Sequence, residues 1–283
     1  MELKHILLAK SIGAYINTLS YTHPEKAVAL AYRFFSEPRI GKLQKNKMPA
    51  VLQNAQMETF QFNDHTFQAY VWGGNENIVL LIHGWESNAS RWEQLLPYLK
   101  KSGSTIIAID GPAHGLSSGT EFNVPTYAEF IDVAVHKFQP NILIGHSIGG
   151  AACVYYQYKY QGPSLQKMVI LGAPSDLKVL THNYVTLLGL NAKMTEMLEN
   201  FFISRFNFRT EDFSGRIFGS EIKIDGIIAH DVDDTVVAFT EGQKIAGSWK
   251  NARFIETKGL GHSMHDDKLY SEIMDFLFGA EPL

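Results

Sequence analysis

The 283-residue chain has one cysteine, Cys153, and therefore no possibility of an intrachain disulfide. Its cysteine usage gives no reason to expect an oxidising compartment. No stretch approaches the roughly 20 apolar residues of a membrane span. An apolar run near the N-terminus is broken by Lys10, and no convincing signal-peptide cleavage site follows it. We therefore expect a cytoplasmic protein.

Basic tracts, internal repeats and low-complexity segments are lacking as well. The formal net charge is −4 and both signs are scattered along the chain, which argues against nucleic acid or an anionic membrane as a partner. No cluster of cysteines and histidines has the spacing of a zinc site, and we expect neither a metal nor an organic cofactor. With 45% hydrophobic and 19% charged residues, the composition is typical of a globular protein with a sizeable core.

The chain does contain a regular alternation of strand-like and helix-like segments. Two amphipathic helices come first, and a β-hairpin at 58–72 follows them. Strands are then predicted at 78–82, 104–109, 141–145, 167–171, 222–229 and 252–256. Helices are predicted at 3–19, 24–36, 88–100, 126–138, 148–160, 235–247 and 266–279. This βαβ alternation is typical of an α/β fold with a doubly wound, mostly parallel sheet.

The alternation stops between about 174 and 220, in a helical segment rich in Met and Phe. We predict an N-terminal helical extension at 1–50, an α/β core at 51–173 and 221–283, and a helical lid at 174–220. An insertion at this point would cover the sheet edge where ligands bind, or would pack as a flank on the core. Four apolar side chains of this segment either line an apolar pocket or fill the lid's own core: Met194, Met197, Phe201 and Phe202.

The pentapeptide Gly145-His146-Ser147-Ile148-Gly149 is the strongest chemical signal. An apolar strand leads into it and a helix follows, which is the setting of a nucleophile elbow, a sharp turn that exposes a serine hydroxyl. A Cβ at either glycine would collide with a neighbouring strand or helix. The pentapeptide also occurs by chance, roughly once in ten chains of this length. Whether Ser147 is a nucleophile therefore depends on finding the other residues that such a serine requires.

A nucleophilic serine in such a turn requires an acid and then a histidine later in the chain, each after a strand. His262 follows the last predicted strand on a glycine-containing loop and is the expected general base, with His265 as runner-up. The acidic loop after the strand at 222–229 supplies the acid. The candidates are Asp234 and Asp233, then Asp231, with Asp176 as a minor alternative.

Two backbone N–H groups are needed to stabilise an oxyanion. The amide of Ile148 directly follows the serine and opens a helix, whose positive end assists. The second candidate is the amide of Trp85, in a His-Gly-Trp loop that follows the buried strand at 78–82.

Taken together, these segments resemble the landmarks of the α/β-hydrolase fold superfamily, in order, over about residues 57–280. The landmarks are His83-Gly84-Trp85, Asp110 to Ser117, the pentapeptide, His230 to Asp234, and Gly261-His262. The resemblance implies that Asp234 is the acid, because it stands four residues after a histidine, and that Asp110 and His114 are mostly structural. The chain departs from the superfamily's pattern at Asp231, where glycine is usual.

The resemblance to the serine branch argues against epoxide hydrolases and haloalkane dehalogenases, which use aspartate at the elbow. We expect a serine hydrolase that cleaves small or medium apolar carboxylic esters through an acyl-enzyme, as a monomer or homodimer. One alternative is a C–C bond hydrolase of ring-cleavage products, in which Arg91, Arg205 or Arg209 would bind a carboxylate. Another is a non-catalytic receptor for a small ligand.

Overall fold

The structure is a computed structural model and describes residues 3–279. It divides into two compact units. The core unit contains Pro38–Ser175 and the chain from Gly215 onward. The helical unit contains the residues up to Glu37 together with Asp176–Ser214. The predicted extension and the predicted lid thus contribute their helices to one unit, while residues 38–50 and 215–220 belong with the sheet.

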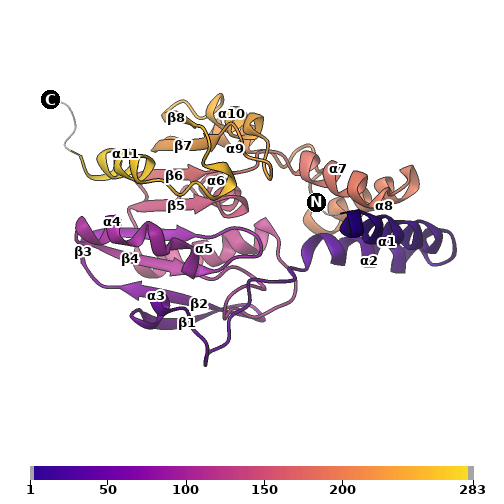
Figure 1. Cartoon of the computed structure of the whole chain (residues 1–283), viewed down its shortest axis with the longest axis horizontal. Coiled ribbons are helices and arrows are strands. Elements are labelled where there is room, and N and C mark those ends of the chain that lie inside the picture. The colour runs from indigo at the N-terminus through magenta and orange to yellow at the C-terminus, as the bar shows by residue number, and fades with distance from the viewer. Residues whose placement is uncertain (1–2, 280–283) are drawn as a thin grey trace. The chain divides into compact units, whose positions relative to one another are not determined.

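The core unit carries all the strands of the described chain and most of the helices that lie between them (Figure 1). The strands are β1 (Gln56–Phe62), β2 (His65–Trp72), β3 (Asn75–Ile82), β4 (Ser104–Ile109), β5 (Ile142–His146), β6 (Lys167–Leu171), β7 (Asp225–Asp231) and β8 (Ala252–Thr257). The helices are α3 (Ala50–Gln53), η1 (Ala89–Gln94), α4 (Leu96–Lys101), α5 (Val124–Phe138), α6 (Ile148–Tyr160), α9 (Gly215–Gly219), α10 (Phe239–Ala246), η2 (Gly261–Ser263) and α11 (Asp267–Phe278).

The strands form one eight-stranded sheet in the order β1-β2-β4-β3-β5-β6-β7-β8. β1 pairs antiparallel with β2, and β2 pairs antiparallel with β4. All other neighbours are parallel. The prediction of an α/β fold with a mostly parallel sheet is confirmed. In such a sheet the carboxyl ends of the parallel strands meet at one edge, where ligands bind.

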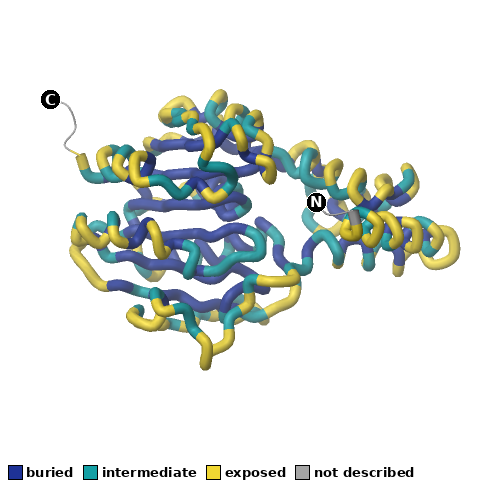
Figure 2. The backbone as a smooth tube through the Cα atoms, viewed as in Figure 1, coloured by how far each residue is buried: buried dark blue, intermediate teal, exposed yellow. Residues whose placement is uncertain are grey.

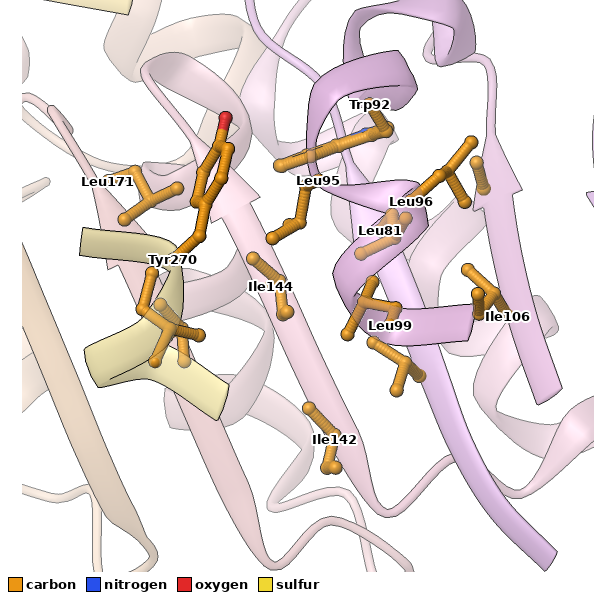
Figure 3. Close-up of a cluster of buried hydrophobic side chains, with 14 of the residues drawn as sticks. Leu81, Trp92, Leu95, Leu96, Leu99, Ile106, Ile142, Ile144, Leu171 and Tyr270 are labelled. Atoms are coloured by element: carbon orange, nitrogen blue, oxygen red, sulfur yellow. The ribbon is translucent and has the colours of Figure 1, made fainter. Parts of the chain in front are cut away.

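Helices cover both faces of this sheet, and its central strands β5 and β6 are buried along almost all of their length (Figure 2). Neighbouring residues of β6 illustrate the two layers, because side chains alternate along a strand. Ile170 lies against Gly150 of α6. Leu171 belongs to a hydrophobic cluster on the other face of the sheet, to which α4 contributes Leu99 and α11 contributes Tyr270 (Figure 3). Burial of these apolar side chains is the main stabilising contribution to the core unit.

Two predicted helices are shorter than expected. The segment predicted as a helix at 88–100 is a 3-10 helix, η1, followed by the short α4, which begins beside Pro97. Proline has no N–H to continue a helical ladder, so one unbroken helix is excluded there. The helix predicted at 235–247 begins only at Phe239. The N–H groups of Val236 and Val237 donate instead to the carboxylate of Asp234.

The helical unit consists of α1 (Leu3–Thr22), α2 (Pro24–Ser36), α7 (Leu177–Leu188) and α8 (Ala192–Phe206). Its core includes Ile16, Ala31 and Leu198. Met194 and Phe202 are buried in this cluster, and Met197 and Phe201 pack against it. The structure therefore places these four side chains in the unit's own core, the second of the two expected alternatives, and they are not assigned to a substrate pocket.

Across residues 3–279, no helix combines the length and the apolar character needed to cross a bilayer. The longest, α1, has 20 residues.

Replacing a fully buried side chain of the core unit should leave a cavity. Ile144 is 0% exposed and lies in the cluster beneath α4 and α11. We expect Ile144→Ala to lower the free energy of unfolding by about 2–5 kcal/mol. Urea unfolding followed by circular dichroism measures this. Ile40→Ala is the matched control, since Ile40 is 63% exposed, and equal losses in the two variants would contradict the assignment of the core.

Candidate active site

The register of the sheet brings four loops together at its carboxyl edge. Ile82 at the end of β3 is aligned with Gly145 of β5, so the His83-Gly84-Trp85 loop leaves the sheet beside the pentapeptide. At the other side, Asp231 at the end of β7 is aligned with Thr257 at the end of β8. The loops after these strands carry Asp234 and His262. The candidate residues from distant parts of the sequence therefore share one edge.

Ser147 occupies the sharp turn between β5 and α6. Its backbone has φ 54° and ψ −131°, a conformation that a residue with a Cβ rarely adopts and that costs about 1–3 kcal/mol. The turn is held by the Ser147 N–H, which donates to the carbonyl of Leu171 at 2.8 Å. The Ser147 carbonyl in turn accepts from the N–H of Gly150 at 2.8 Å. Strain of this kind is typical of functional sites.

The two glycines of the pentapeptide are required by their neighbours, as predicted. A Cβ at Gly145 would lie 2.6 Å from the Sγ of Cys153. A Cβ at Gly149 would lie 2.2 Å from the carbonyl oxygen of His83 and 2.5 Å from that of Ile82. These carbonyls are backbone atoms and cannot move aside without shifting the loop after β3. The glycines thus allow α6 to approach the loop that carries Trp85.

His262 connects the serine to an acid. Its Nε2 lies 2.9 Å from the Oγ of Ser147, and its Nδ1 lies 2.8 Å from Oδ2 of Asp234. Because a carboxylate can only accept, Nδ1–H donates to Asp234 and the Nε2 lone pair faces the serine hydroxyl. This is the tautomer in which a histidine can remove a proton from serine.

Asp234 is the aspartate that the structure brings to His262. Its side chain is fully buried, and its Oδ1 accepts the N–H groups of Val236 and Val237 at 2.8 and 2.9 Å. His230 Nε2 lies 3.4 Å from Oδ2 of Asp234 and donates to the Val237 carbonyl. The carboxylate is therefore fixed by its own turn before it meets the imidazole.

The other candidates for base and acid lie elsewhere. Asp233 is exposed. His265 contacts the hydroxyl of Tyr270 through Nδ1, and burial lowers its pKa to about 4. Asp176 accepts a hydrogen bond from Ser214 in the helical unit. Of Asp233 and Asp234, between which the residues alone left the choice open, the structure brings Asp234 to His262.

The loop after β3 lies directly against the serine. A Cβ at Gly84 would be 2.9 Å from the Cβ of Ser147, which places Gly84, and Trp85 after it, beside the nucleophile candidate. Ile148 is the first residue of α6, and the first N–H groups of a helix have no intrahelical acceptor. The segments that carry the two amides expected to bind an oxyanion thus both adjoin Ser147.

A neutral histidine fixes the far side of this loop. His114 is fully buried, its Nε2 accepts the N–H of Glu86 at 2.9 Å, and its Nδ1–H donates to the Pro112 carbonyl at 2.8 Å. Burial lowers the pKa of His114 to about 4. The imidazole therefore stays neutral at physiological pH, which the acceptor role of Nε2 requires. Glu86 directly follows Trp85, so His114 helps to set where the Trp85 amide lies.

Asp110 connects three segments beneath the same loop. Its buried carboxylate accepts the N–H groups of Ala89 and Leu116, each at 2.9 Å, and the hydroxyl of Tyr70 at 2.8 Å. Burial is the largest influence and raises the pKa of Asp110 to about 6. These contacts agree with the structural role that the resemblance implied for Asp110 and His114.

Three contacts at the site were not anticipated from the sequence. His146 Nε2–H donates to the carbonyl of His262 at 2.7 Å, and Arg91 donates to the carbonyl of Ser263 at 2.8 Å. Two consecutive carbonyls of the histidine loop are thus held. The carboxylate of Asp231 accepts the N–H of Leu260 on the same loop. Asp231 had a signal in the sequence, since it departs from the superfamily's glycine, and Arg91 is predicted there only as a possible ligand for a carboxylate.

The arrangement can carry out acyl-transfer chemistry. A serine hydroxyl faces a correctly oriented imidazole, a buried carboxylate orients that imidazole, and a loop and a helix N-terminus lie beside the serine. These are the parts needed for nucleophilic attack on a carbonyl carbon. Within residues 3–279, no group of three or more His, Cys, Asp or Glu side chains is arranged to hold a metal ion.

Comparison with known families agrees with the fold. The family model of the alpha/beta hydrolase fold matches residues 77–222, more than half of the 283 residues. The chain belongs to this family. The matched range includes the His-Gly-Trp loop and the pentapeptide.

Curated relatives include esterases and lipases at low identity. The chain is 25% identical over 244 residues to a bifunctional esterase/perhydrolase from Acinetobacter calcoaceticus, covering 68% of this chain and 88% of that one. It is 29% identical over 104 residues to a monoacylglycerol lipase from Mycolicibacterium smegmatis, but this match covers only 34% of this chain and 37% of the lipase.

Solved structures share the fold at lower identity. An esterase from Exiguobacterium antarcticum has a TM-score of 0.60 and 18% identity, covering 77% of this chain and 98% of the esterase. A meta-cleavage product hydrolase from Pseudomonas fluorescens IP01 also has a TM-score of 0.60, with 15% identity and coverage of 79% and 98%. At these identities the likeness establishes the fold, and the reaction must be argued from the site.

The neutrality of buried His114 predicts a specific pH dependence. The imidazole titrates near 6.5 in the unfolded chain and at about 4 in the folded one. Between these pH values the unfolded chain binds more protons than the folded one. The contribution of His114 to the free energy of unfolding is therefore fully present above pH 6.5. It falls as the pH drops toward 4, by at most about 1.4 kcal/mol per pH unit.

We expect His114→Gln, which cannot titrate, to be less stable than the wild type at pH 7 and to approach it as the pH falls to 4.5. Urea unfolding at several pH values measures the difference. The other histidines are present in both proteins, so their titration contributes equally to the two free energies of unfolding and does not affect the difference. A difference in stability that does not change with pH would contradict a neutral, depressed His114.

Proposed function

We propose that this protein is a serine hydrolase that cleaves small or medium apolar carboxylic esters through an acyl-enzyme. The observation that carries the proposal is the continuous contact from Ser147 Oγ through both nitrogens of His262 to buried Asp234, at 2.9 and 2.8 Å. Relatives named as an esterase/perhydrolase and a lipase support an ester as substrate.

In the proposed reaction His262 removes the proton of Ser147 as its Oγ attacks the ester carbonyl. The amides of Trp85 and Ile148 stabilise the oxyanion. His262, now an imidazolium stabilised by Asp234, gives its proton to the leaving alcohol. A water molecule then attacks the acyl-enzyme by the same route, with His262 again as base, and the acid is released while Ser147 regains its proton.

Asp234 acts through orientation and charge. It keeps the proton on Nδ1, which leaves Nε2 free as a base, and it stabilises the imidazolium that forms. No metal or organic cofactor has a step in this mechanism. We propose a small-molecule ester as the only partner that the reaction requires, with a cytoplasmic location and a monomeric or homodimeric state as further predictions.

Labelling with a fluorophosphonate, together with turnover of p-nitrophenyl esters of graded chain length, tests the proposal. We expect one covalent adduct, on Ser147, and hydrolysis of the shorter esters. Ser147→Ala should abolish both signals and leave the circular dichroism spectrum unchanged. A folded wild-type protein with neither adduct nor turnover would instead favour the non-catalytic receptor.

The acid is tested by a matched pair of substitutions. Asp234→Asn removes the charge beside His262 and favours the wrong tautomer, so we expect kcat to fall by about 10⁴-fold. Asp233→Asn changes an exposed aspartate on the same loop and should leave kcat within about twofold. The reverse ranking would exclude Asp234. His262→Ala should lower kcat as strongly as the serine variant, because members of such an array act as a unit.

A second candidate, a C–C bond hydrolase of carboxylated ring-cleavage products, is favoured by one observation. The guanidinium of Arg91 is partly buried beside the His262 loop, yet no ion pair of the described chain includes it. Its Nε is a buried donor without an acceptor in residues 3–279. Burial lowers the pKa of Arg91 to about 10, so it stays charged and would attract a carboxylate. A solved relative is named as a meta-cleavage product hydrolase.

The two candidates differ in their dependence on Arg91. For a C–C hydrolase, Arg91→Met should raise KM at least about tenfold for a carboxylated ring-cleavage product, since a charge-assisted contact is lost, and should change KM for a neutral ester little. Arg253→Met, at an exposed arginine, is the control. Absence of turnover of the carboxylated substrate by the wild type would reject this candidate.

A further inference from the structure

Asp231 is a fully buried carboxylate at the carboxyl end of β7, where the superfamily's pattern has glycine. Its Oδ2 accepts the hydroxyl of Thr257 at 2.8 Å and the N–H of Leu260 at 2.9 Å. Its Oδ1 accepts the N–H of Asp233 at 3.0 Å. A glycine could make none of these contacts, so the departure from the pattern adds a specific set of bonds.

The partners of this carboxylate belong to both loops that meet at the candidate site. Thr257 ends β8 and Leu260 stands two residues before His262. Asp233 directly precedes Asp234 in the chain. One oxygen of Asp231 therefore contacts the loop that presents the imidazole, and the other contacts the turn that presents the acid.

The loop between Thr257 and His262 contains two glycines that do little to restrain it. Gly259 and Gly261 have φ values of 84° and 60°, and a Cβ built on either would meet no atom within 4 Å. Both are conformations that glycine adopts without strain, so neither sterics nor packing at these two positions fixes the path of the chain. The bonds from Asp231 to Thr257 and Leu260 restrain the segment immediately before His262.

The charge on Asp231 is sustained by these same donors. Burial opposes the ionised form, but hydrogen bonds from Leu260, Thr257 and Asp233 outweigh it and hold the pKa of Asp231 below its ordinary value. No ion pair of the described residues includes Asp231. An ionised carboxylate that accepts N–H and O–H groups makes stronger bonds than a neutral acceptor, which suits a clamp between two loops.

We propose that Asp231 is a positioning residue that sets the geometry of His262 against Asp234 and Ser147 by joining the acid loop to the histidine loop. The inference rests on the proposed serine hydrolase reaction and names a further residue on which its rate depends. Asp231 contacts neither Ser147 nor the imidazole, so it acts through the backbone of both loops. An error of about 1 Å in placing a catalytic group can cost about 100-fold in rate.

The experiment compares steady-state hydrolysis of a p-nitrophenyl ester and the rate constant of fluorophosphonate labelling in the full-length wild type and its variants. Asp231→Asn keeps the side-chain volume but replaces one carboxylate oxygen with an NH2 group. That group cannot accept the hydrogen bonds that the oxygen of Asp231 accepts. We expect kcat and the labelling rate to fall together by about 10- to 100-fold, with KM within about twofold. Asp225→Asn, at the exposed opposite end of β7, is the matched control and should retain wild-type values.

A milder variant covers the case in which Asp231→Asn fails to fold. Thr257→Val keeps the shape of the side chain and removes one of the three donors to Asp231. We expect a smaller fall in kcat, about two- to tenfold, again without a change in KM. Combining it with Asp231→Asn should add less than the product of the two separate effects, because both act on the same contact.

A purely structural role predicts a different outcome. If Asp231 only stabilises the fold, active-site titration will show fewer active molecules while each retains wild-type kcat, and that result would overturn the inference. A positioning role predicts full titration at reduced kcat. In the His262→Ala background, Asp231→Asn should cause no further loss of the residual rate, since the group that it positions is gone.

Failure of this inference is distinguishable from failure of the proposed function. A wild-type protein that is neither labelled at Ser147 nor active on esters refutes the hydrolase itself. A wild type that is labelled and active, with Asp231→Asn labelled at the same rate, refutes only the role of Asp231.

Discussion

The contact between His262 Nδ1 and Asp234 Oδ2, 2.8 Å long, is the interaction on which the geometry of the site depends. It decides which imidazole nitrogen carries the proton and turns the other toward Ser147. The sheet delivers its two partners, since β7 and β8 are adjacent and parallel and end in register at Asp231 and Thr257. The rest of the site keeps these groups from moving, which is the condition for stabilising a transition state without reorganisation.

Maintaining that geometry requires unfavourable features that are compensated locally. The backbone of Ser147 is strained, and the turn is stabilised by the bond to Leu171 on the next strand. Burying His83 and His114 removes two imidazoles from water and lowers their pKa values to about 3 and about 4. In their neutral form each can accept a backbone N–H and donate to a carbonyl, which a charged imidazole cannot do. The strained turn and the buried imidazoles lower the stability of the fold but hold the loops of the site in place, as is common at functional sites.

The sequence predicted most of the fold because periodicity and strand–turn–helix order are local properties. The strands, the pentapeptide with its two tightly packed glycines, and the late histidine followed from such patterns. Two predicted helices proved shorter than expected because one residue interrupts each of them, namely Pro97 in one and the carboxylate of Asp234 in the other. The contacts of Asp231, His146 and Arg91 were beyond reach, because each depends on the three-dimensional path of the histidine loop. The packing of α1 and α2 with α7 and α8 into one compact unit likewise depends on tertiary contacts, which the sequence pattern does not show.

The apolar residues of the inserted segment show why composition is a poor guide to a binding pocket. Met194 and Phe202 are buried among Ile16, Ala31 and their neighbours in the helical unit. A small helical unit must bury such side chains to be stable at all, so an excess of Met and Phe is first a requirement of folding. Substrate preference is therefore better sought among groups of the core unit that folding does not require there. Arg91 is such a group in respect of its charge, because no ion pair within residues 3–279 includes its partly buried guanidinium, and a partly buried cation without a counter-ion opposes folding.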